Sequence, residues 1–477
     1  MKLNDLLEGI HIKRTVNYSD VTVSSVTCDS RNVVKNSLFV CFEGNKNDGH
    51  DYIDDAVSRG AAALVVRREV CTNIPQIIVE NSRRALSVIA GNYYGNPARK
   101  MKIITIVGTN GKTSTAEILS DIFSSAGFCT ATIGTLGYKI GKQRSKGVLT
   151  TPDPLDLNYH LAEMQKAGVE YVFIEASAHA IFYDKLACIK ANATILTNIT
   201  QDHLDFFKTM DEYTKTKLSY FSLDNTALAI INSDDACGRK MIIDHKLPII
   251  TYGIENPADV FAIDLKENEY GLSFTVNAFD EIEQIVTPLH GKFNVYNIMS
   301  AIGTAMYFGI KLGVIAKALE RILPVPGRYN VKYIQDRRVV LDFAHTPDGL
   351  NNLLEDLRNN YDGRIVTVFG CGGDRDKLKR PIMGAIAAKY SDFVIITNDN
   401  PRFEEAGEIA DEIIKGIPAG ARYEVILDRE KAIRRAFYIT NVGDTVVVAG
   451  KGHEDYMDIK GKKIPYSDSA VLEKLSR

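Results

Sequence analysis

The sequence predicts an α/β fold built from three domains. The chain has 477 residues, which is about three times the size of a typical domain. Short apolar runs rich in Val and Ile alternate with amphipathic runs of helical period, a pattern typical of parallel sheets joined by crossover helices. Pro and Gly interrupt this alternation at Asn96-Pro97 and at Pro326-Gly327. We expect a small N-terminal α/β domain, a central parallel-sheet domain and a C-terminal doubly wound, Rossmann-like domain, over residues 1–98, 99–327 and 328–477.

Composition argues against several classes of function. The 57 Lys and Arg residues nearly balance 60 Asp and Glu, and there is no basic stripe, so we expect no nucleic-acid partner. The N-terminus lacks the apolar core of a signal peptide, and no apolar stretch is long enough to span a bilayer. The 7 cysteines are scattered and form no Cys-x-x-Cys pair, which favours reduced thiols. We therefore expect a cytoplasmic protein with no membrane insertion.

The first domain is predicted to mix short strands with helices. Strands are expected over residues 37–42 and 62–66, and helices over residues 53–59 and 84–94.

A glycine loop then opens the central domain. An apolar run over residues 103–107 precedes the loop, and a helical pattern over residues 115–126 follows it. A strand, a glycine loop and a helix N-terminus together form a layout that binds nucleotide phosphates. Lys112 can reach the terminal phosphates, and the Thr113 hydroxyl can hold Mg²⁺. A glycine turn without a ligand is the alternative, but Lys-Thr directly after the second glycine argues against it. The loop consists of Gly108, Thr109, Asn110, Gly111, Lys112, Thr113 and Ser114.

The remaining pattern predicts two sheets and a flap. Alternating runs without helical period over residues 260–288 indicate an antiparallel flap. The other apolar runs alternate with helices, which is the pattern of doubly wound domains. These strands are expected over residues 171–174, 193–197, 227–231, 339–343, 365–369, 393–397 and 445–449.

Three residues of the central domain are candidates for ion binding or catalysis. Glu175 ends an apolar strand, where a carboxylate could complete a Mg²⁺ site, although a solvated strand-end Glu is the simpler alternative. His203 lies between two Asp residues after another strand, which suits a ligand or an acid/base group as well as a structural role. Lys217 lies in the next helical run, where a surface lysine is the default.

Polar clusters follow three strands of the C-terminal domain. Residues 370–380 form a glycine-rich turn with Arg375, residues 399–402 read Asp-Asn-Pro-Arg, and residues 450–454 read Gly-Lys-Gly-His-Glu. The ends of parallel strands meet at one edge of a sheet, so we expect these clusters to lie together. Their mixture of cations and anions suits a zwitterion such as an amino acid. The stiff loop around Thr150 and Thr151 suits polar substrate contact, with an ordinary Pro-rich loop as the alternative.

Taken together, these segments resemble the Mur ligase family over nearly the whole chain. The matching motifs follow one another in order, so chance similarity is a poor explanation. They are GTNGKTS, TTPDP, DHLD, FNVYN, PVPGR, DFAHTPDGL, GCGGDRDKLKR, DNPR and GKGHEDY.

The resemblance implies an ATP-dependent, amide-forming ligase of peptidoglycan assembly. Its motifs are closest to those of the members that add the third residue of the stem peptide to UDP-MurNAc-L-Ala-D-Glu. The implied cofactors are ATP, Mg²⁺ at two sites and a carbamylated Lys217. This role for Lys217 replaces the expectation that it is an ordinary surface lysine. Residues that match ATP contacts are the glycine loop, Asn297, Arg328 and Asp342. Residues that match contacts to the UDP substrate are Ser30, Asn45, Lys46, Thr150, Thr151, Ser177 and Lys185. Lys112, Glu175, His203 and Lys217 match catalytic positions, and Thr113, Glu175, His203 and Lys217 match metal ligands.

The resemblance also implies which amino acid is added. The Asp-Asn-Pro-Arg form is typical of members that use meso-diaminopimelate, whose distal carboxylate Arg402 would hold; L-lysine is the alternative. Tyr183 and Lys185 depart from the family, because Gln and Arg are common there. A degenerate copy that binds nucleotide or UDP-sugar without turnover is a further alternative, and the expected state is a monomer. Residues that match amino-acid contacts are Arg375, Asp399, Asn400, Pro401, Arg402, Gly450 and Glu454.

Overall fold

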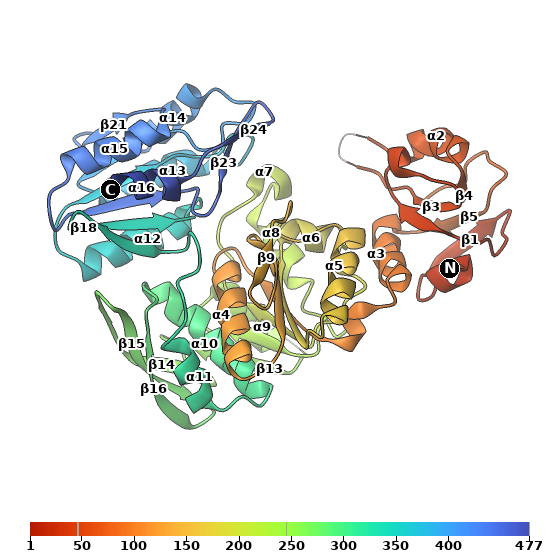
Figure 1. Cartoon of the computed structure of the whole chain (residues 1–477), viewed down its shortest axis with the longest axis horizontal. Coiled ribbons are helices and arrows are strands. Elements are labelled where there is room, and N and C mark those ends of the chain that lie inside the picture. Colours follow the sequence, from red (N-terminus) through yellow and green to blue (C-terminus); the bar gives the residue numbers. More distant parts are fainter. Residues whose placement is uncertain (45–46, 245, 477) are drawn as a thin grey trace. The chain divides into compact units, whose positions relative to one another are not determined.

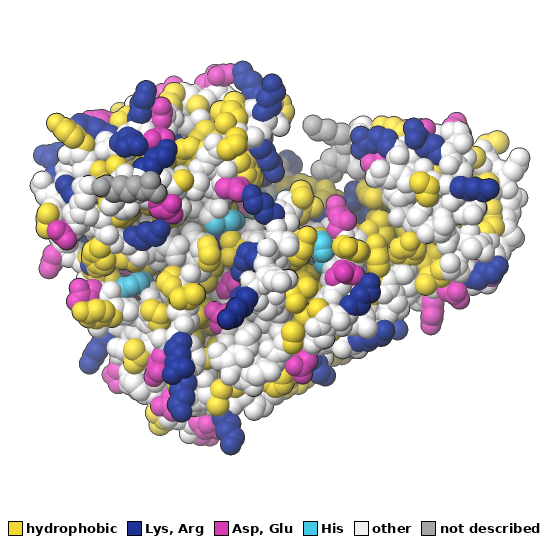
Figure 2. Space-filling model, viewed as in Figure 1, with side chains coloured by type: hydrophobic (Ala, Val, Ile, Leu, Met, Phe, Trp, Pro, Cys, Tyr) yellow, Lys and Arg dark blue, Asp and Glu magenta, His cyan; other side chains and the backbone are white. Residues whose placement is uncertain are grey.

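The computed structural model describes residues 1–44, 47–244 and 246–476. Residue contacts divide the chain into two compact units. Figure 1 labels the helices and strands along the chain. On the face shown in Figure 2, basic and acidic side chains are interspersed, in keeping with the formal net charge of -3. The first unit comprises Met1–Val107, Gly127–Ile195 and Thr216–Ala229, and the second comprises Gly108–Ala126, Leu196–Lys215 and Ile230–Arg477.

The N-terminal part of the first unit is a five-stranded sheet between helices. The strand order is β1-β5-β4-β3-β2, with β1 antiparallel to β5 and the other neighbours parallel. Side chains alternate between the two faces, so Leu38 and Phe39 of β3 enter different cores. Helix α2 packs into one core, and α1 and α3 pack into the other. The elements are α1 (Leu3–Leu6), β1 (Ile12–Val16), β2 (Ser25–Thr27), η1 (Ser30–Asn32), β3 (Ser37–Val40), η2 (Gly49–Tyr52), α2 (Ile53–Ser58), β4 (Ala61–Val66), β5 (Gln76–Val79) and α3 (Ser82–Tyr93).

The remainder of the first unit carries the strand from which the glycine loop starts. Its strand order is β11-β6-β10-β7-β8-β9, and β10 runs parallel to both β6 and β7. In this register Glu175 pairs with Ile106, so its carboxylate stands at the carboxyl end of β6. The elements are η3 (Pro97–Lys100), β6 (Lys102–Val107), β7 (Thr130–Gly134), β8 (Gly137–Ile140), β9 (Gln143–Ser145), α5 (Pro154–Lys166), β10 (Tyr171–Ala176), α6 (Ala178–Phe182) and β11 (Ala193–Leu196).

The second unit begins with the glycine loop and its helix, and contains the flap. Strands β16-β15-β14-β13-β12 follow in that order, and β14, β15 and β16 pair antiparallel, which confirms the predicted flap. Helix α4 packs against α10 and α11. The elements are α4 (Lys112–Ser125), α7 (Leu204–Phe207), α8 (Met210–Leu218), β12 (Ala229–Asn232), α9 (Ala236–Asp244), β13 (Ile249–Gly253), β14 (Val260–Asn268), β15 (Gly271–Ala278), β16 (Glu281–Thr287), α10 (Lys292–Tyr307) and α11 (Leu312–Leu319). The residues of α8 from Thr216 onward, and Ala229 of β12, belong to the first unit.

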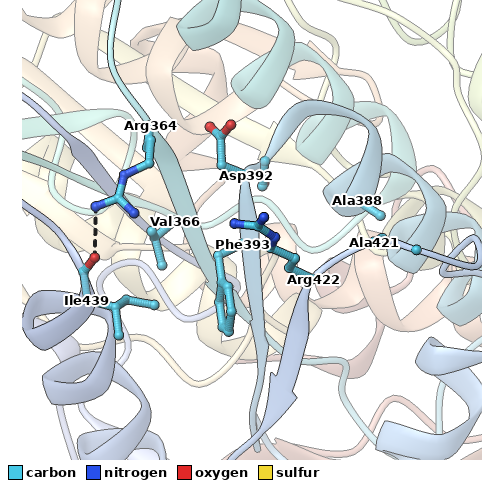
Figure 3. A pocket seen from close by; sticks show the side chains of 10 residues that line it. Arg364, Val366, Ala388, Asp392, Phe393, Ala421, Arg422 and Ile439 are labelled. Carbon is cyan, nitrogen blue, oxygen red and sulfur yellow. Dashed lines mark hydrogen bonds between the residues drawn. The ribbon is translucent and has the colours of Figure 1, made fainter.

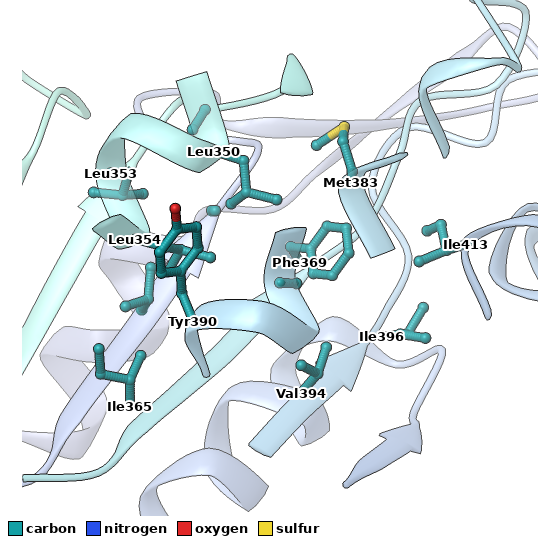
Figure 4. Packing of buried hydrophobic residues seen from close by; sticks show 14 of the residues in the cluster. Leu350, Leu353, Leu354, Ile365, Phe369, Met383, Tyr390, Val394, Ile396 and Ile413 are labelled. Atoms are coloured by element: carbon teal, nitrogen blue, oxygen red, sulfur yellow. The ribbon is translucent and has the colours of Figure 1, made fainter. Parts of the chain in front are cut away.

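The C-terminal part of the second unit is a doubly wound sheet. The order is β17-β18-β22-β19-β20-β21, with every pair parallel except β17 and β18. Side chains of α12, α13 and α14 fill one face around Phe369 (Figure 4), and α15 and α16 cover the other. The predicted α/β class is confirmed. The elements are β17 (Asn330–Ile334), β18 (Arg337–Asp342), α12 (Pro347–Asn360), β19 (Ile365–Phe369), α13 (Lys379–Tyr390), β20 (Phe393–Ile396), α14 (Ala406–Ile414), β21 (Tyr423–Val425), α15 (Arg429–Ile439), β22 (Thr445–Ala449), β23 (Tyr456–Ile459), β24 (Lys462–Pro465) and α16 (Asp468–Leu475).

A buried acidic network connects the flap with the C-terminal part. The Tyr329 hydroxyl donates to Asp356 Oδ2 at 2.6 Å, and the Tyr361 hydroxyl donates to Glu267 Oε1 at 3.1 Å. His290 Nδ1 lies 3.0 Å from the same Glu267 oxygen. Burial, followed by the charge of Glu267, raises the pKa of Asp356 to about 6.

This raised pKa predicts how stability changes with pH. An unfolded Asp titrates near about pH 3.9, so between there and about 6 the folded state binds more protons. The stabilising contribution of Asp356 is therefore complete below about pH 4 and is lost as the pH rises through its folded pKa. Relative to the unmutated protein, we expect the free energy of unfolding of Asp356→Asn to rise by about 1–3 kcal/mol as the pH increases across this window. Urea unfolding at several pH values measures this, with the exposed Asp362→Asn as control; parallel pH profiles for Asp356→Asn and the unmutated protein would contradict it.

Candidate active site

The glycine loop of the second unit needs both of its glycines. Gly111 adopts a left-handed φ of 86° at the N-terminus of α4, a conformation that suits glycine. A Cβ at Gly111 would lie 2.5 Å from Asn297 Oδ1, and one at Gly108 would lie 1.8 Å from Thr197 Oγ1. The close approach of these polar side chains therefore requires glycine at both positions. Because Gly111 caps the helix, α4 begins at Lys112, three residues before the predicted start.

A polar segment after β11 holds the loop in place. The backbone N–H of Thr109 donates to the Asn198 carbonyl at 2.9 Å, and that of Asn110 donates to the Asn198 side chain at 2.9 Å. Thr197 Oγ1 donates to the Asn110 carbonyl at 2.6 Å. Sequence reasoning assigned no role to Thr197 or Asn198. The polar pair at the end of an apolar strand was the available signal.

The cation of the loop is positioned by backbone oxygens. Lys112 Nζ donates to the carbonyls of Gly108 and Thr109, both at 2.8 Å. These contacts keep the ammonium group above the turn, where phosphate oxygens would gather at the N-terminus of α4.

The three further residues predicted to bind ATP also lie in the second unit. Arg328 Nη2 donates to Thr113 Oγ1 at 3.1 Å, which places this guanidinium beside the loop. Asn297 is buried, and its Oδ1 accepts a hydrogen bond from Thr115 at 3.2 Å. Asp342 accepts from the Tyr329 N–H at 2.6 Å; burial raises the pKa of Asp342, and the charge of Arg328 opposes this. The structure thus brings Arg328 and Asn297 to the loop.

His203 is held in an unusual backbone conformation beside a buried carboxylate. Its φ is 56°, and its Nε2 lies 3.2 Å from Asp202 Oδ2. Burial alone would raise the pKa of Asp202, but His203 and Lys379, whose Nζ lies 3.9 Å away, lower it below its usual value. Asp202 is therefore held in its ionised form by its basic neighbours.

The polar clusters of the C-terminal part share one edge of the sheet. In the parallel registers, Phe369 pairs with Ile396 and Val368 with Val448, so the clusters follow adjacent strand ends. A Cβ at Gly450 would lie 2.6 Å from Asp399 Oδ2, which shows how closely two of the clusters approach. The expected grouping of the clusters is present in the structure.

These clusters offer separate cationic and anionic regions. A Cβ at Gly372 would lie 2.9 Å from Arg402 Nη1 and 3.8 Å from Arg375 Cγ, so these two side chains are neighbours. Burial and then the charge of Arg402 lower the pKa of Arg375. Arg402 Nη1 donates to the Gly373 carbonyl at 2.6 Å. On the other side, Asn400 Nδ2 donates to Glu454 Oε2 at 2.9 Å, and the buried Lys451 donates to the same oxygen at 2.8 Å. Lys451 belongs to the predicted cluster 450–454 but was not among the residues matched to amino-acid contacts.

The first unit groups four further site residues. Thr151 Oγ1 donates to the Glu175 carbonyl at 2.6 Å and accepts from the Ser177 N–H at 3.1 Å. Thr150 Oγ1 lies 3.2 Å from Thr135 Oγ1, and Thr135 donates to both carboxylate oxygens of Glu175. Glu175 is only 2% exposed, so the alternative of a solvated strand-end Glu is wrong.

The remaining predicted residues of the first unit are more dispersed. Lys217 is 1% exposed, so the default of a surface lysine is wrong as well. Lys185 pairs with Asp153 at 2.7 Å, and Ser30 is buried at the start of η1. Asn45 and Lys46 lie outside the described residues.

The predicted metal ligands divide between the units. Thr113 and His203 belong to the second unit, and Glu175 and Lys217 to the first. Within residues 1–44, 47–244 and 246–476, no three His, Cys, Asp or Glu side chains are grouped as a metal site. Over the same residues, no helix combines the length and apolar character needed to cross a membrane.

A hollow at the opposite ends of the C-terminal strands is a poorer candidate (Figure 3). It is lined by Arg364 and Asp392, among others, but both charges are already paired within the protein. Arg364 contacts Asp444 at 2.7 Å, and Asp392 contacts Arg358 at 2.7 Å. Two of the three charged residues that line the hollow are therefore occupied within the protein, and the exposed Arg422 is the third.

The fold and these clusters define a class of protein. A glycine loop at a helix N-terminus, and a second cluster of grouped cationic and anionic side chains in the same compact unit, are features expected of an enzyme that uses a nucleoside triphosphate to activate and join substrates. Three family descriptions match the chain: "Mur ligase family, catalytic domain" over residues 22–94, "Mur ligase middle domain" over 106–305, and "Mur ligase, glutamate ligase domain" over 327–452. The chain belongs to the Mur ligase family and is an ATP-dependent, amide-forming ligase.

Individual relatives match along the whole chain. The UDP-N-acetylmuramoyl-L-alanyl-D-glutamate–2,6-diaminopimelate ligase of Syntrophomonas wolfei is 39% identical over 485 residues, covering 100% of this chain and 99% of that protein. The ligase of the same name from Clostridium tetani is 38% identical, with coverage of 100% and 99%. A solved structure of a ligase of this name has a TM-score of 0.72 at 29% identity, covering 100% of this chain and 98% of that one.

Proposed function

We propose that this chain joins meso-diaminopimelate to UDP-MurNAc-L-Ala-D-Glu in the synthesis of the peptidoglycan precursor, with conversion of ATP to ADP and phosphate. The names of the relatives support this substrate pair. The observation that carries the proposal is the pair of neighbouring guanidiniums, Arg375 and Arg402, beside the anionic Asn400–Glu454 contact. A substrate with a carboxylate and an ammonium group at each end needs both regions, whereas L-lysine lacks the second carboxylate.

The reaction consists of two displacements. An oxygen of the D-Glu γ-carboxylate attacks the γ-phosphorus of ATP, the bond to the bridging oxygen breaks, and ADP leaves. The amine of diaminopimelate, after losing a proton, then attacks the acyl phosphate, and phosphate leaves as the amide forms. Lys112 and Arg328 supply fixed positive charge at the phosphates, and the loop orients them. Asn297 and Asp342 are assigned to the nucleoside, and Ser30, Thr150, Thr151, Ser177 and Lys185 to the UDP substrate. Asp399, Pro401 and Gly450 complete the amino-acid site.

Magnesium ions at two sites are part of this proposal. When bound, Mg²⁺ would neutralise phosphate charge, and a hydroxyl together with carboxylates is a suitable donor set. Thr113, Glu175, His203 and a modified Lys217 would supply the ligands. The fit rests on the burial of Glu175 among hydroxyl groups and on the buried carboxylate of Asp202 beside His203.

The burial of Lys217 supports a carbamate. The side chain is only 1% exposed, and a lysine amine held away from bulk water is the kind of group that can react with CO₂. The amine nitrogen bonds to the carbon, a proton leaves, and the side chain becomes an anion that can face a cation.

This assignment predicts a dependence on CO₂. We expect turnover to fall severalfold in degassed, bicarbonate-free buffer and to return when bicarbonate is added. Lys217→Arg should remain inactive in both buffers, because its guanidinium cannot form the carbamate. The exposed Lys215→Ala should respond as the unmutated protein does. A resonance from labelled bicarbonate in unmutated protein, absent in Lys217→Arg, provides a direct check; its absence from both would contradict the carbamate.

The first test of the function is phosphate release with ATP, Mg²⁺ and UDP-MurNAc-L-Ala-D-Glu. Release with meso-diaminopimelate but not with L-lysine, and a product of the expected mass, is the expected result. Phosphate release with L-lysine alone would show that the enzyme is specific for L-lysine. Release with neither amino acid would favour a protein that binds nucleotide or UDP-sugar without turnover. We further propose a monomer that acts in the cytoplasm, in keeping with its seven free cysteines.

A further inference from the structure

Arg83 of α3 is held between two aromatic rings in the first unit. Its Cζ lies 4.2 Å from the centre of the Phe42 ring and 4.2 Å from that of Tyr183. Its Nη2 donates to the Glu43 carbonyl at 2.9 Å. Contacts with two aromatic rings restrict the orientation of a guanidinium and leave its N–H groups for hydrogen bonding. The side chain is therefore oriented before any ligand binds.

The charge of Arg83 is the one left unpaired among the neighbouring cations. Lys185 is paired with Asp153 at 2.7 Å, and Arg84 contacts Asp184 at 3.6 Å. Across the described parts of the chain, Arg83 has no ion-pair partner of its own. Burial lowers the pKa of Arg83, which means that its charge is partly desolvated, although a guanidinium stays protonated. A partly desolvated cation with a free edge attracts an anion strongly.

The surroundings of Arg83 indicate which anion. Cys28 and Asp153 are both near enough to influence its pKa. Cys28 lies two positions before Ser30, which the proposed function assigns to the UDP end of the substrate. Asp153 lies two positions after Thr151, which it assigns to the peptide end. In the substrate, the diphosphate joins the uridine to the sugar that carries the peptide.

We infer that Arg83 is a positioning residue that binds the diphosphate of the UDP-linked substrate. The inference rests on the proposed function. It also gives a role to Tyr183, which departs from the Gln common in related enzymes: its ring forms one wall of the guanidinium site. A Gln there would leave that face of Arg83 without an aromatic partner.

The test uses UDP as a probe, so that binding is measured without turnover. Calorimetry gives the Kd for UDP, and steady-state assays give kcat and KM for the full substrate. We expect Arg83→Ala to raise both the UDP Kd and the substrate KM by about 10- to 100-fold, with kcat nearly unchanged. Arg83→Lys should recover part of the loss, because it keeps the charge but not the planar fork. Tyr183→Gln should weaken UDP binding by about 2- to 5-fold. Arg84→Ala, next to Arg83 on the same helix, is the matched control and should change neither constant.

Each alternative has a distinct outcome. An unchanged UDP Kd in Arg83→Ala overturns the inference, and if the substrate KM still rises, the guanidinium holds a carboxylate of the peptide instead. A lowered melting temperature with equal losses for UDP, ATP and diaminopimelate, not recovered by Arg83→Lys, overturns it in favour of a structural role. If the unmutated protein binds UDP through Arg83 but releases no phosphate with either amino acid, the proposed function fails while the inference stands.

Discussion

Lys112→Ala is expected to lower kcat/KM for ATP by about three orders of magnitude or more. Lys112 is the first residue of α4, and its ammonium group is positioned over the loop by two backbone carbonyls. As the γ-phosphoryl group is transferred, charge develops on its oxygens, and a fixed cation there stabilises the transition state more than the ground state. The loss should therefore appear in kcat as well as in KM. Phosphate release at saturating substrates measures it.

The control for this variant is Lys102→Ala. Lys102 starts β6, the strand that leads into the loop, and its side chain is exposed. We expect this variant to keep its activity, since its charge lies at the far end of the strand. Lys112→Ala should also keep a normal melting temperature and bind UDP normally. Turnover of Lys112→Ala within tenfold of the unmutated rate would contradict the assignment of the loop.

Local pattern was sufficient to predict the framework of the fold. The run over residues 446–449 is wholly apolar because both faces of β22 are covered, and this is visible in the sequence as three consecutive valines followed by alanine. The glycine loop could likewise be placed, since glycine at a strand end before Lys-Thr has a local meaning. The start of α4 was predicted three residues late, because the left-handed Gly111 that caps it cannot be distinguished by composition from any other loop glycine.

Burial of polar side chains could not be predicted in the same way. The sequence pattern alone favoured exposed side chains for Glu175 and Lys217, but both are almost fully buried. Their burial depends on segments distant in sequence, such as the Thr135 hydroxyl and amide that bind the Glu175 carboxylate. For Lys217, only the family resemblance argued against a surface position, because a resemblance carries information about tertiary environment that periodicity lacks.

Contacts between segments that are distant along the chain could not be predicted from the sequence either. Asn198 anchors the glycine loop across 88 positions, and the rings around Arg83 come from segments on either side of it in the chain. Neither Phe42 nor Tyr183 has a neighbour in sequence that signals this role. Such sites become visible only when the fold has brought their parts together.

Arg402→Asn is expected to lower kcat/KM for meso-diaminopimelate by about 10²- to 10³-fold, mostly through KM. Arg402 adopts a left-handed φ of 51°, so Asn is a better probe than Ala, because Asn tolerates this conformation. The substitution removes one of two neighbouring guanidiniums and with it the charge-assisted hydrogen bonds to a carboxylate. The kcat/KM of Arg402→Lys should lie between those of the unmutated protein and Arg402→Asn, since lysine keeps the positive charge but lacks the planar, two-pronged guanidinium. Competition between meso-diaminopimelate and L-lysine measures the change in preference.

A purely structural role for Arg402 predicts a different result. Its donation to the Gly373 carbonyl orders the turn after β19, so loss of that bond could disturb Arg375 as well. In that case the melting temperature would fall and both amino acids would be affected alike, whereas loss of a carboxylate contact affects meso-diaminopimelate and leaves any weak reaction with L-lysine unchanged. Arg422→Ala, an exposed arginine at the opposite ends of the same strands, controls for the loss of positive charge. An unchanged KM for meso-diaminopimelate in Arg402→Asn would contradict the role given to Arg402. Arg375 alone would then be the group that binds the distal carboxylate.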